Sequence, residues 1–266
     1  MQTFRTDLHV HTVLSPCGDL EMSPARIVTL AHAMGLDIIG ITDHNSTKHC
    51  EMVWKLGRKL GLTVIPGCEM TSREEVHCLG LFEDFDALNE FQHYLDKRLT
   101  LIPNNPDRLG YQAVVDEYEN IIEEVSNYLG ASLDASIEEI EQKVHQLSGI
   151  FVPAHIDRPR NSLFSQLGFF PPELKVEALQ ISKLADEKTV RAKYQISSDI
   201  TLVKFSDAHY LGDLGNIFTN FEMEEPTFGE IRKALLRIDG RKCLIPEAPL
   251  QPLPERERPG DQALWI

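Results

Sequence analysis

The stretch TDLHVHTVLSPCGDLEMSP (residues 6–24) joins an expected strand to an expected helix through a polar loop. His9 and His11 lie two residues apart near the end of the strand, so their side chains point to the same face. Ser23 stands where a helix N-cap belongs, and Pro24 suits the first helical position. The stretch therefore predicts a β–α unit that carries two imidazoles at the carboxyl end of its strand.

The rest of the chain repeats this alternation of short apolar segments with amphipathic ones. The expected strands are FRTDLHV, DIIGIT, TVIPGCEM, VHCLGLF, GIFVPAH, VEALQIS, ITLVKFS and NIFTNFEM. Between them lie helical segments with clear N-terminal signals, such as the capping-box pair Thr227 and Glu230. Alternating strands and helices are typical of an α/β barrel.

Residues 84–149 depart from this alternation. The stretches YQAVVDEYENIIEEVSNYL and SIEEIEQKVHQL follow the Pro/Asn break IPNNPDR, and the pair Ser136 and Glu139 forms a second capping box. We interpret 84–149 as a helical insertion in a catalytic barrel that spans residues 1–245, acting as a packing module or as a lid. Residues 246–266 form a Pro-rich tail, which we expect to be extended.

Composition limits the functional classes that the chain can belong to. Its 266 residues are 42% hydrophobic, which suffices for one barrel with a sizeable core, and we expect no membrane span, no signal peptide and a cytoplasmic location. The five cysteines contain no C-x-x-C pair, which argues against a disulfide framework or a zinc ribbon. A formal net charge of −15 argues against tight binding of long nucleic acid, although bound cations would reverse the local sign.

Six of the ten histidines fall at the ends of expected strands, together with several carboxylates. With His9 and His11, these residues are Asp43, His44, Glu69, His77, His155, Asp207 and His209. The carboxyl ends of barrel strands converge on one face, where such side chains can meet. Each motif alone is more often incidental or a core feature, but their recurrence argues for metal binding, and nine ligands exceed the need of one ion. Cys17 and Cys68 flank the candidates and are interpreted as packing residues.

The motifs DLHVHT, DIIGITDHN, GCE, PAHIDR and SDAH resemble, in this order, those of the PHP (polymerase and histidinol phosphatase) superfamily over about residues 5–210. The resemblance implies a distorted (β/α)7 barrel with two or three divalent metal ions (Mn, Fe or Zn). It assigns His9, His11, Glu69 and Asp207 to the first ion. Glu69 would bridge to a second ion held by His77 and His155. The third ion would be bound by Asp19, His44 and His209.

Two of these assignments rest on loops that differ from the family pattern. Asp19 precedes Pro24 by five residues, as in the family's SDGxLSP, but the additional SPCG lengthens the loop. After His155, the family's usual proline is replaced by Ile156. Arg158 holds the arginine position expected there, and Arg160 is a second candidate for binding the substrate phosphate.

The resemblance implies a phosphoesterase acting on a small phosphorylated metabolite or nucleotide. Two ions would lower the pKa of a shared water and give a metal-bridged hydroxide that attacks phosphorus, while Arg158 binds the phosphate oxygens. Asp43 would orient a ligand histidine, and His209 is one candidate for the general acid. The alternatives are a 5′–3′ exonuclease on short oligonucleotides, a histidinol phosphatase, or a non-catalytic metal-binding module. The sequence leaves the native metal and the oligomeric state open.

Overall fold

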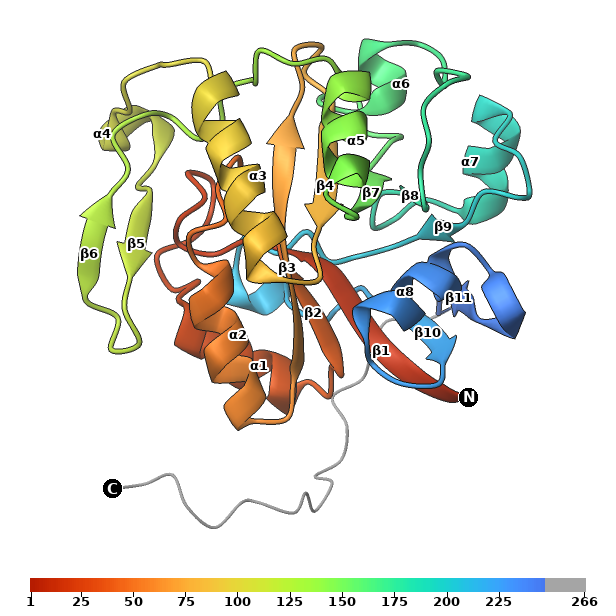
Figure 1. The fold of residues 1–266 in the computed structure, drawn as a ribbon, viewed down its shortest axis with the longest axis horizontal. Helices are drawn as coiled ribbons and strands as arrows, with labels where there is room; N and C mark the ends of the chain where they lie inside the picture. The colour runs from red at the N-terminus through yellow and green to blue at the C-terminus, as the bar shows by residue number, and fades with distance from the viewer. Residues whose placement is uncertain (247–266) are drawn as a thin grey trace.

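A computed structural model describes residues 1–246, and its main feature is a curled sheet of seven strands. Helices cover the outer face of the sheet (Figure 1). The order across the sheet is β11 (Lys242–Leu244), β10 (Thr219–Met223), β1 (Gln2–Val10), β2 (Ile38–Ile41), β3 (Thr63–Thr71), β4 (His77–Leu81) and β7 (Ile150–Pro153). The expected α/β fold is thus confirmed, although the sheet is mixed: β4 runs antiparallel to β3 and β7, and β10 runs antiparallel to β1.

Two short strands continue the curl of the sheet between β7 and β1. The strands β8 (Leu179–Gln180) and β9 (Leu202–Val203) pair in parallel as a separate sheet. The amide of Ile156, after β7, donates to the carbonyl of Gln180 (2.9 Å), and the amide of His11 donates to that of Ala208, after β9 (3.1 Å). These bonds bring the segments after β7, β9 and β1 to one end of the curled sheet.

The reversed direction of β4 decides where its first residue lies. His77 begins β4 and pairs with Thr71 at the end of β3. Because the two strands are antiparallel, the amino end of β4 lies beside the carboxyl end of β3. His77 therefore reaches the same edge as residues that end the parallel strands.

The helix starts largely follow the expected capping signals. The side chain of Ser23 accepts a hydrogen bond at the start of α1 (Pro24–Ala33), and Ser136 with Glu139 forms the full capping box of α5 (Ile137–Gln146). Thr227 caps α8 (Phe228–Leu235), but the carboxylate of Glu230 binds Arg241 instead of closing a box. The other helices are α2 (Cys50–Lys59), α3 (Phe85–Arg98), α4 (Pro106–Leu109), α6 (Leu163–Gln166), α7 (Glu187–Tyr194) and the 3-10 turns Leu211–Asp213 and Ile238–Gly240.

The prediction of helix for residues 111–129 is wrong, because this stretch forms a hairpin of β5 (Ala113–Val115) and β6 (Ile121–Glu124). The carboxylate of Asp116 accepts hydrogen bonds from the amides of Tyr118 and Asn120, both at 2.9 Å. Glu119 has a φ of 65°, which closes the turn. The hairpin stands apart from the main sheet (Figure 1), whereas α3 and α5 are helical as expected.

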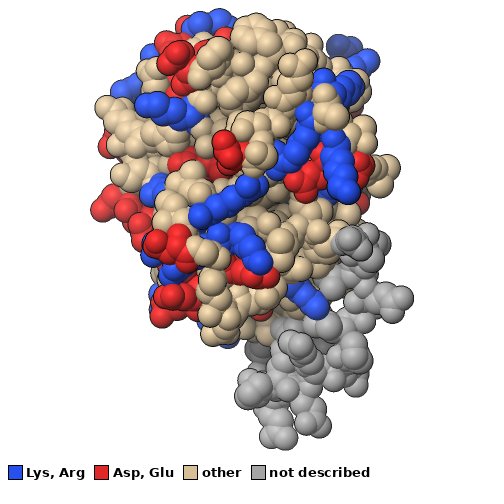
Figure 2. Space-filling model, turned by 90° about the vertical axis from the view of Figure 1, so that its right-hand side faces the viewer, with Lys and Arg blue, Asp and Glu red and all other residues tan. Residues whose placement is uncertain are grey.

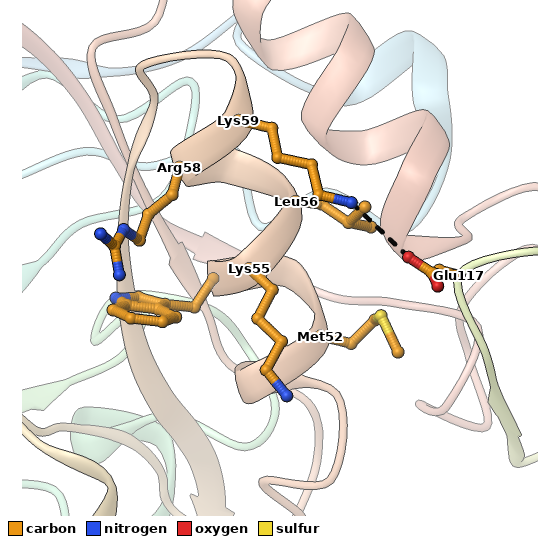
Figure 3. Close-up of a pocket in the computed structure, with 7 residues that line it drawn as sticks. Met52, Lys55, Leu56, Arg58, Lys59 and Glu117 are labelled. Atoms are coloured by element: carbon orange, nitrogen blue, oxygen red, sulfur yellow. Dashed lines mark ion pairs between the residues drawn. The ribbon is translucent and has the colours of Figure 1, made fainter.

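An exposed ion pair links the hairpin to α2. Lys59 of α2 lies 3.6 Å from the carboxylate of Glu117, across a surface hollow of about 550 Å³ that Trp54 and Arg58 also line (Figure 3). Within residues 1–246, no helix is long and apolar enough to cross a membrane. Apart from residue 246, the expected Pro-rich tail lies outside the described residues.

Candidate metal centre

Four buried side chains from three parts of the chain meet at the end of the curled sheet where the segments after β1, β7 and β9 lie together. His9 lies in β1, His11 follows it, Glu69 lies in β3, and Asp207 follows β9. The Nε2 atoms of His9 and His11 are 3.1 Å apart. Both lie 3.1–3.3 Å from Glu69 Oε2 and from Asp207 Oδ1. The structure thus brings together the four residues expected to bind the first ion.

The spacing of these four ligand atoms fits a divalent cation. In a tetrahedral site with ligand bonds of roughly 2.0–2.1 Å, neighbouring ligand atoms are about 3.3 Å apart. The separations of 3.1–3.3 Å between imidazole nitrogens and carboxylate oxygens match this value.

The hydrogen bonds of the opposite ring nitrogens show that these imidazoles turn Nε2 toward the cluster. His9 Nδ1 donates to Gln180 Oε1 (2.9 Å), and His209 Nδ1 donates to the carbonyl of Asp207 (2.9 Å). His11 Nδ1 lies 2.9 Å from Ser15 Oγ, whose own proton goes to Asp43 (2.7 Å), so the imidazole donates here too. Because each Nδ1 atom has its own hydrogen-bonded proton, Nε2 is the atom that would bind a metal ion, once any proton on it is displaced.

The two oxygens of Glu69 face different histidines. Oε2 contacts His9 and His11, whereas Oε1 lies 3.0 Å from His77 Nδ1 and 3.2 Å from His155 Nε2. His77 reaches this oxygen because β4 is reversed, and the side-chain amide of Asn161 lies 3.1 Å from its other nitrogen. The residues expected around the second ion are therefore also brought together, with Glu69 between the two groups.

A third group of ligand atoms includes His44 and His209, as expected, but not the carboxylate of Asp19. The ligand atoms of His11, Cys17, His44 and His209 all lie within 4.8 Å of one another. Asp19 Oδ1 instead accepts a hydrogen bond from the amide of Glu21 (2.8 Å), and among the described residues Asp19 joins no such group. The packing role expected for Cys17 from the sequence does not account for the place of its sulfur among these ligand atoms.

Asp43 supports His11 rather than its neighbour His44. Its carboxylate accepts hydrogen bonds from the amide (2.7 Å) and hydroxyl (2.8 Å) of Thr12 and from the hydroxyl of Ser15. Ser15 in turn accepts the proton of His11 Nδ1 and the amide proton of His44 (3.1 Å). Ser15 and Gln180 were not found from the sequence, because hydroxyl and amide side chains are common and only the folded chain selects these two.

The charged neighbours of Glu69 and His11 shift the pKa values of both groups. Burial opposes ionisation of Glu69, but His9, His77 and His44 hold the pKa of its carboxyl well below the usual range. Burial also opposes charge on His11, yet Asp207 and Glu69 raise its pKa to about 10. A site that binds protons this firmly also suits a divalent cation, which competes for the same lone pairs.

Arg158 lies at the rim of the cluster. Its Nη2 atom donates to Asp207 Oδ2 at 2.5 Å, and its side chain is 36% exposed. Arg160, the second candidate for phosphate binding, is exposed two residues further along. His155 and Asp207 both have positive φ values, of 29° and 46°. Non-glycine residues adopt such backbone only where the surrounding structure enforces it, and they concentrate at functional sites.

Comparison of the sequence with models of protein families shows the family to which the chain belongs. The PHP domain model matches residues 7–160, which is more than half of the chain and includes both His9 and His155. The chain belongs to the PHP domain family. A cluster of buried histidines and carboxylates able to bind metal agrees with this membership.

Similar proteins and structures of similar fold come from bacteria and archaea. The uncharacterised protein YqxK of Bacillus subtilis is 24% identical over 276 residues, covering 92% of this chain and 65% of YqxK. The lesion-specific endonuclease PfuEndoQ from Pyrococcus furiosus has a similar fold, with a TM-score of 0.70 and 23% identity over 91% of this chain and 58% of that one. This chain thus spans less than two thirds of either protein.

A putative metal-dependent phosphoesterase from Bifidobacterium adolescentis matches almost end to end. It gives a TM-score of 0.52 with 18% identity, covering 88% of this chain and 96% of that protein. At such identities these structures establish the fold alone.

Proposed function

We propose that this PHP domain is a metal-dependent phosphoesterase that hydrolyses the phosphate ester of a small metabolite or nucleotide. The observation that carries the proposal is the placement of Glu69, whose two oxygens face His9 and His11 on one side and His77 and His155 on the other. Two divalent ions held this way would lower the pKa of a water molecule and offset the charge of a phosphate.

Side chains around the metal positions would exclude water and bind the substrate phosphate. Glu69 and Asp207 are 1% and 4% exposed, so bulk water is excluded from the floor of the site. Asp207 fixes one nitrogen of Arg158, and this orients the guanidinium at the rim, where its further N–H groups can bind phosphate oxygens. His209 has its Nδ1 proton bonded to the carbonyl of Asp207, and this favours a ligand role over that of a general acid.

Cleavage of a nucleic-acid strand is the second candidate. Endonuclease Q, which shares this fold, has been solved with a 27-mer duplex carrying an abasic lesion at its active site. Against a long substrate stand the net charge of −15 and the interleaving of acidic and basic side chains on the face shown in Figure 2. We therefore favour a small substrate, with short oligonucleotides as the next class to test.

The test is a substrate panel on the chain loaded separately with Mn²⁺, Fe²⁺ or Zn²⁺. The panel contains a nucleoside bisphosphate, histidinol phosphate, 5′-phosphorylated short oligonucleotides and an abasic duplex. We expect phosphate release from a small ester, abolished in Glu69→Gln and retained in Glu83→Gln, a matched change at an exposed loop carboxylate. Strand cleavage without phosphate release would favour the second candidate, and no turnover with two ions bound per chain would favour a non-catalytic module.

A further inference from the structure

The loop after β1 places a thiol beside the metal centre. Two backbone hydrogen bonds shape this loop, from the amide of Ser15 to the carbonyl of Thr12 (3.1 Å) and from Gly18 to Ser15 (2.8 Å). The turn requires glycine at residue 18, because a Cβ atom there would lie 2.4 Å from the carbonyl oxygen of Thr12. Cys17 lies between these two anchored residues.

The far end of the same loop is tied to one of the histidines. The amide of Asp19 donates to the carbonyl of His209 at 2.8 Å. The backbone of Asp19 therefore helps to position the loop, while its carboxylate is used by the amide of Glu21. With both flanks of Cys17 fixed, its sulfur lies within 4.8 Å of the ligand nitrogens of His11, His44 and His209.

The ring nitrogens of the histidines near Cys17 provide a second, independent indication that a cation binds here. His44 is 7% exposed, and its Nδ1 atom makes no hydrogen bond in the described structure. This atom lies 3.4 Å from Glu69 Oε2, so His44 stands between the Glu69 cluster and Cys17. His209 keeps a lone pair on Nε2, because its Nδ1 proton is bonded to Asp207. His11 stacks on His209 with 4.2 Å between ring centroids, but its Nε2 atom is committed to Glu69 and Asp207.

We propose that Cys17, His44 and His209 form a third cation position, in which a thiolate takes the place that the family resemblance assigned to Asp19. Three protein ligands leave one coordination position open, as in catalytic zinc sites. A sulfur–imidazole donor set favours Zn²⁺ over Mn²⁺, whereas the neighbouring carboxylate-rich positions accept either ion. The inference rests on the proposed function, since this position adjoins the same cluster.

Co²⁺ provides a spectroscopic test that does not depend on turnover. The full chain is stripped with a chelator and titrated with Co²⁺, and a thiolate ligand gives a charge-transfer absorption band in the near ultraviolet. We expect this band in the wild type and in Asp19→Asn. Cys17→Ser should lose the band and should bind one Zn²⁺ ion fewer per chain than the wild type. Cys243→Ser is the matched control, because this half-buried thiol lies in β11. A band that survives Cys17→Ser, or one lost in Asp19→Asn, would overturn the proposal.

Alkylation of the wild-type chain makes the test independent of any variant's folding. The Cys17 residue is exposed, although burial around its sulfur, with Glu69 and Asp207 nearby, raises the pKa of the thiol to about 12. Prolonged treatment with excess iodoacetamide should therefore modify it in the stripped protein, as measured on its peptide by mass spectrometry. Three equivalents of Zn²⁺ per chain, enough to fill all three positions, should suppress this modification, and the same amount of Mn²⁺ should not. Modification of Cys17 unaffected by Zn²⁺ would refute the third position even if phosphate release is observed. Protection without turnover would retain the third position and count against the proposed function.

Discussion

At the scale of single residues, the hydrogen bonds on the outer nitrogens of the histidines determine what the cluster can bind. Ser15 illustrates this, because its hydroxyl accepts a hydrogen bond from His11 Nδ1 and donates one to the carboxylate of Asp43. All three side chains are buried. Without that acceptor, His11 loses the bond that fixes its ring and tautomer. Ser15 is therefore a positioning residue that acts on the ion through His11.

Replacing Ser15 with alanine tests this role. We expect metal affinity to fall about tenfold to a hundredfold, the usual effect of removing a hydrogen-bond partner from a ligand histidine. Competition with a chromophoric chelator measures the change, and Ser198→Ala at an exposed serine is the control. An unaltered affinity in Ser15→Ala would mean that the bond to His11 does not position the ligand.

Residue identities at the centre were predictable where local spacing carried the information. His9 and His11 alternate on one strand, and Asp207 and His209 share the same spacing. Gln180 could not be predicted as the partner of His9, because 171 residues separate them and only the closure of the sheet brings them together. Cys17 and Asp19 differ by two positions in one loop, where the path of the backbone decides which side chain reaches the histidines.

At the scale of elements, α5 is held to the sheet by a charged group on its last turn. His145 Nε2 lies 3.1 Å from Glu177, and its Nδ1 contacts Glu141 one turn earlier in the helix. Glu177 also accepts a hydrogen bond from the amide of Phe151 in β7 (2.8 Å), and Arg232 of α8 lies 4.0 Å away. The hydrogen bond to Glu177 raises the pKa of His145, and Glu141 adds to this effect, although burial acts in the opposite direction.

This contact predicts a pH-dependent contribution to stability. Because the folded-state pKa of His145 is raised above about 6.5, the stabilisation is full below that pH and is lost as pH rises through the folded-state value. His145→Gln should lower the free energy of unfolding by roughly 1 kcal/mol at pH 5.5 and by less at pH 9. Urea unfolding at both pH values measures it, with His93→Gln in α3 as control. A loss that is equal at both pH values would exclude the ionic contribution.

The hairpin shows where element prediction from sequence stops. Residues 111–129 have apolar residues at spacings that also suit a helix, and nothing local decides between the two. Tertiary contacts decide: Ala113 and Val115 pack on Val13. The amide of Val115 also donates to Nε2 of the buried His49 (2.9 Å). His49 Nδ1 donates to Thr12, whose hydroxyl binds Asp43, so the misassigned hairpin is hydrogen-bonded to the support of the metal centre.

At the scale of the whole molecule, the ligands come from segments spread over most of the described chain. They lie in strands or directly beside them, from β1 to β9, so the unfolded chain has no preformed site. An ion that binds only the folded state stabilises it by mass action, by about 2.7 kcal/mol at a hundredfold excess over Kd. Binding of Zn²⁺ to histidines and cysteines of the unfolded chain would reduce this value.

Zn²⁺ should therefore raise the thermal midpoint of unfolding in proportion to the logarithm of its free concentration. Because an ion must displace the protons that Glu69 and Asp207 hold on His9 and His11, the stabilisation should be smaller at pH 5.5 than at pH 7.5. Differential scanning calorimetry across a Zn²⁺ titration measures both effects. Glu69→Gln should lose most of the Zn²⁺ dependence and Glu83→Gln should keep it. If Glu69→Gln is stabilised by Zn²⁺ as strongly as the wild type, the ion binds elsewhere, and Glu69 does not join the two halves of the centre.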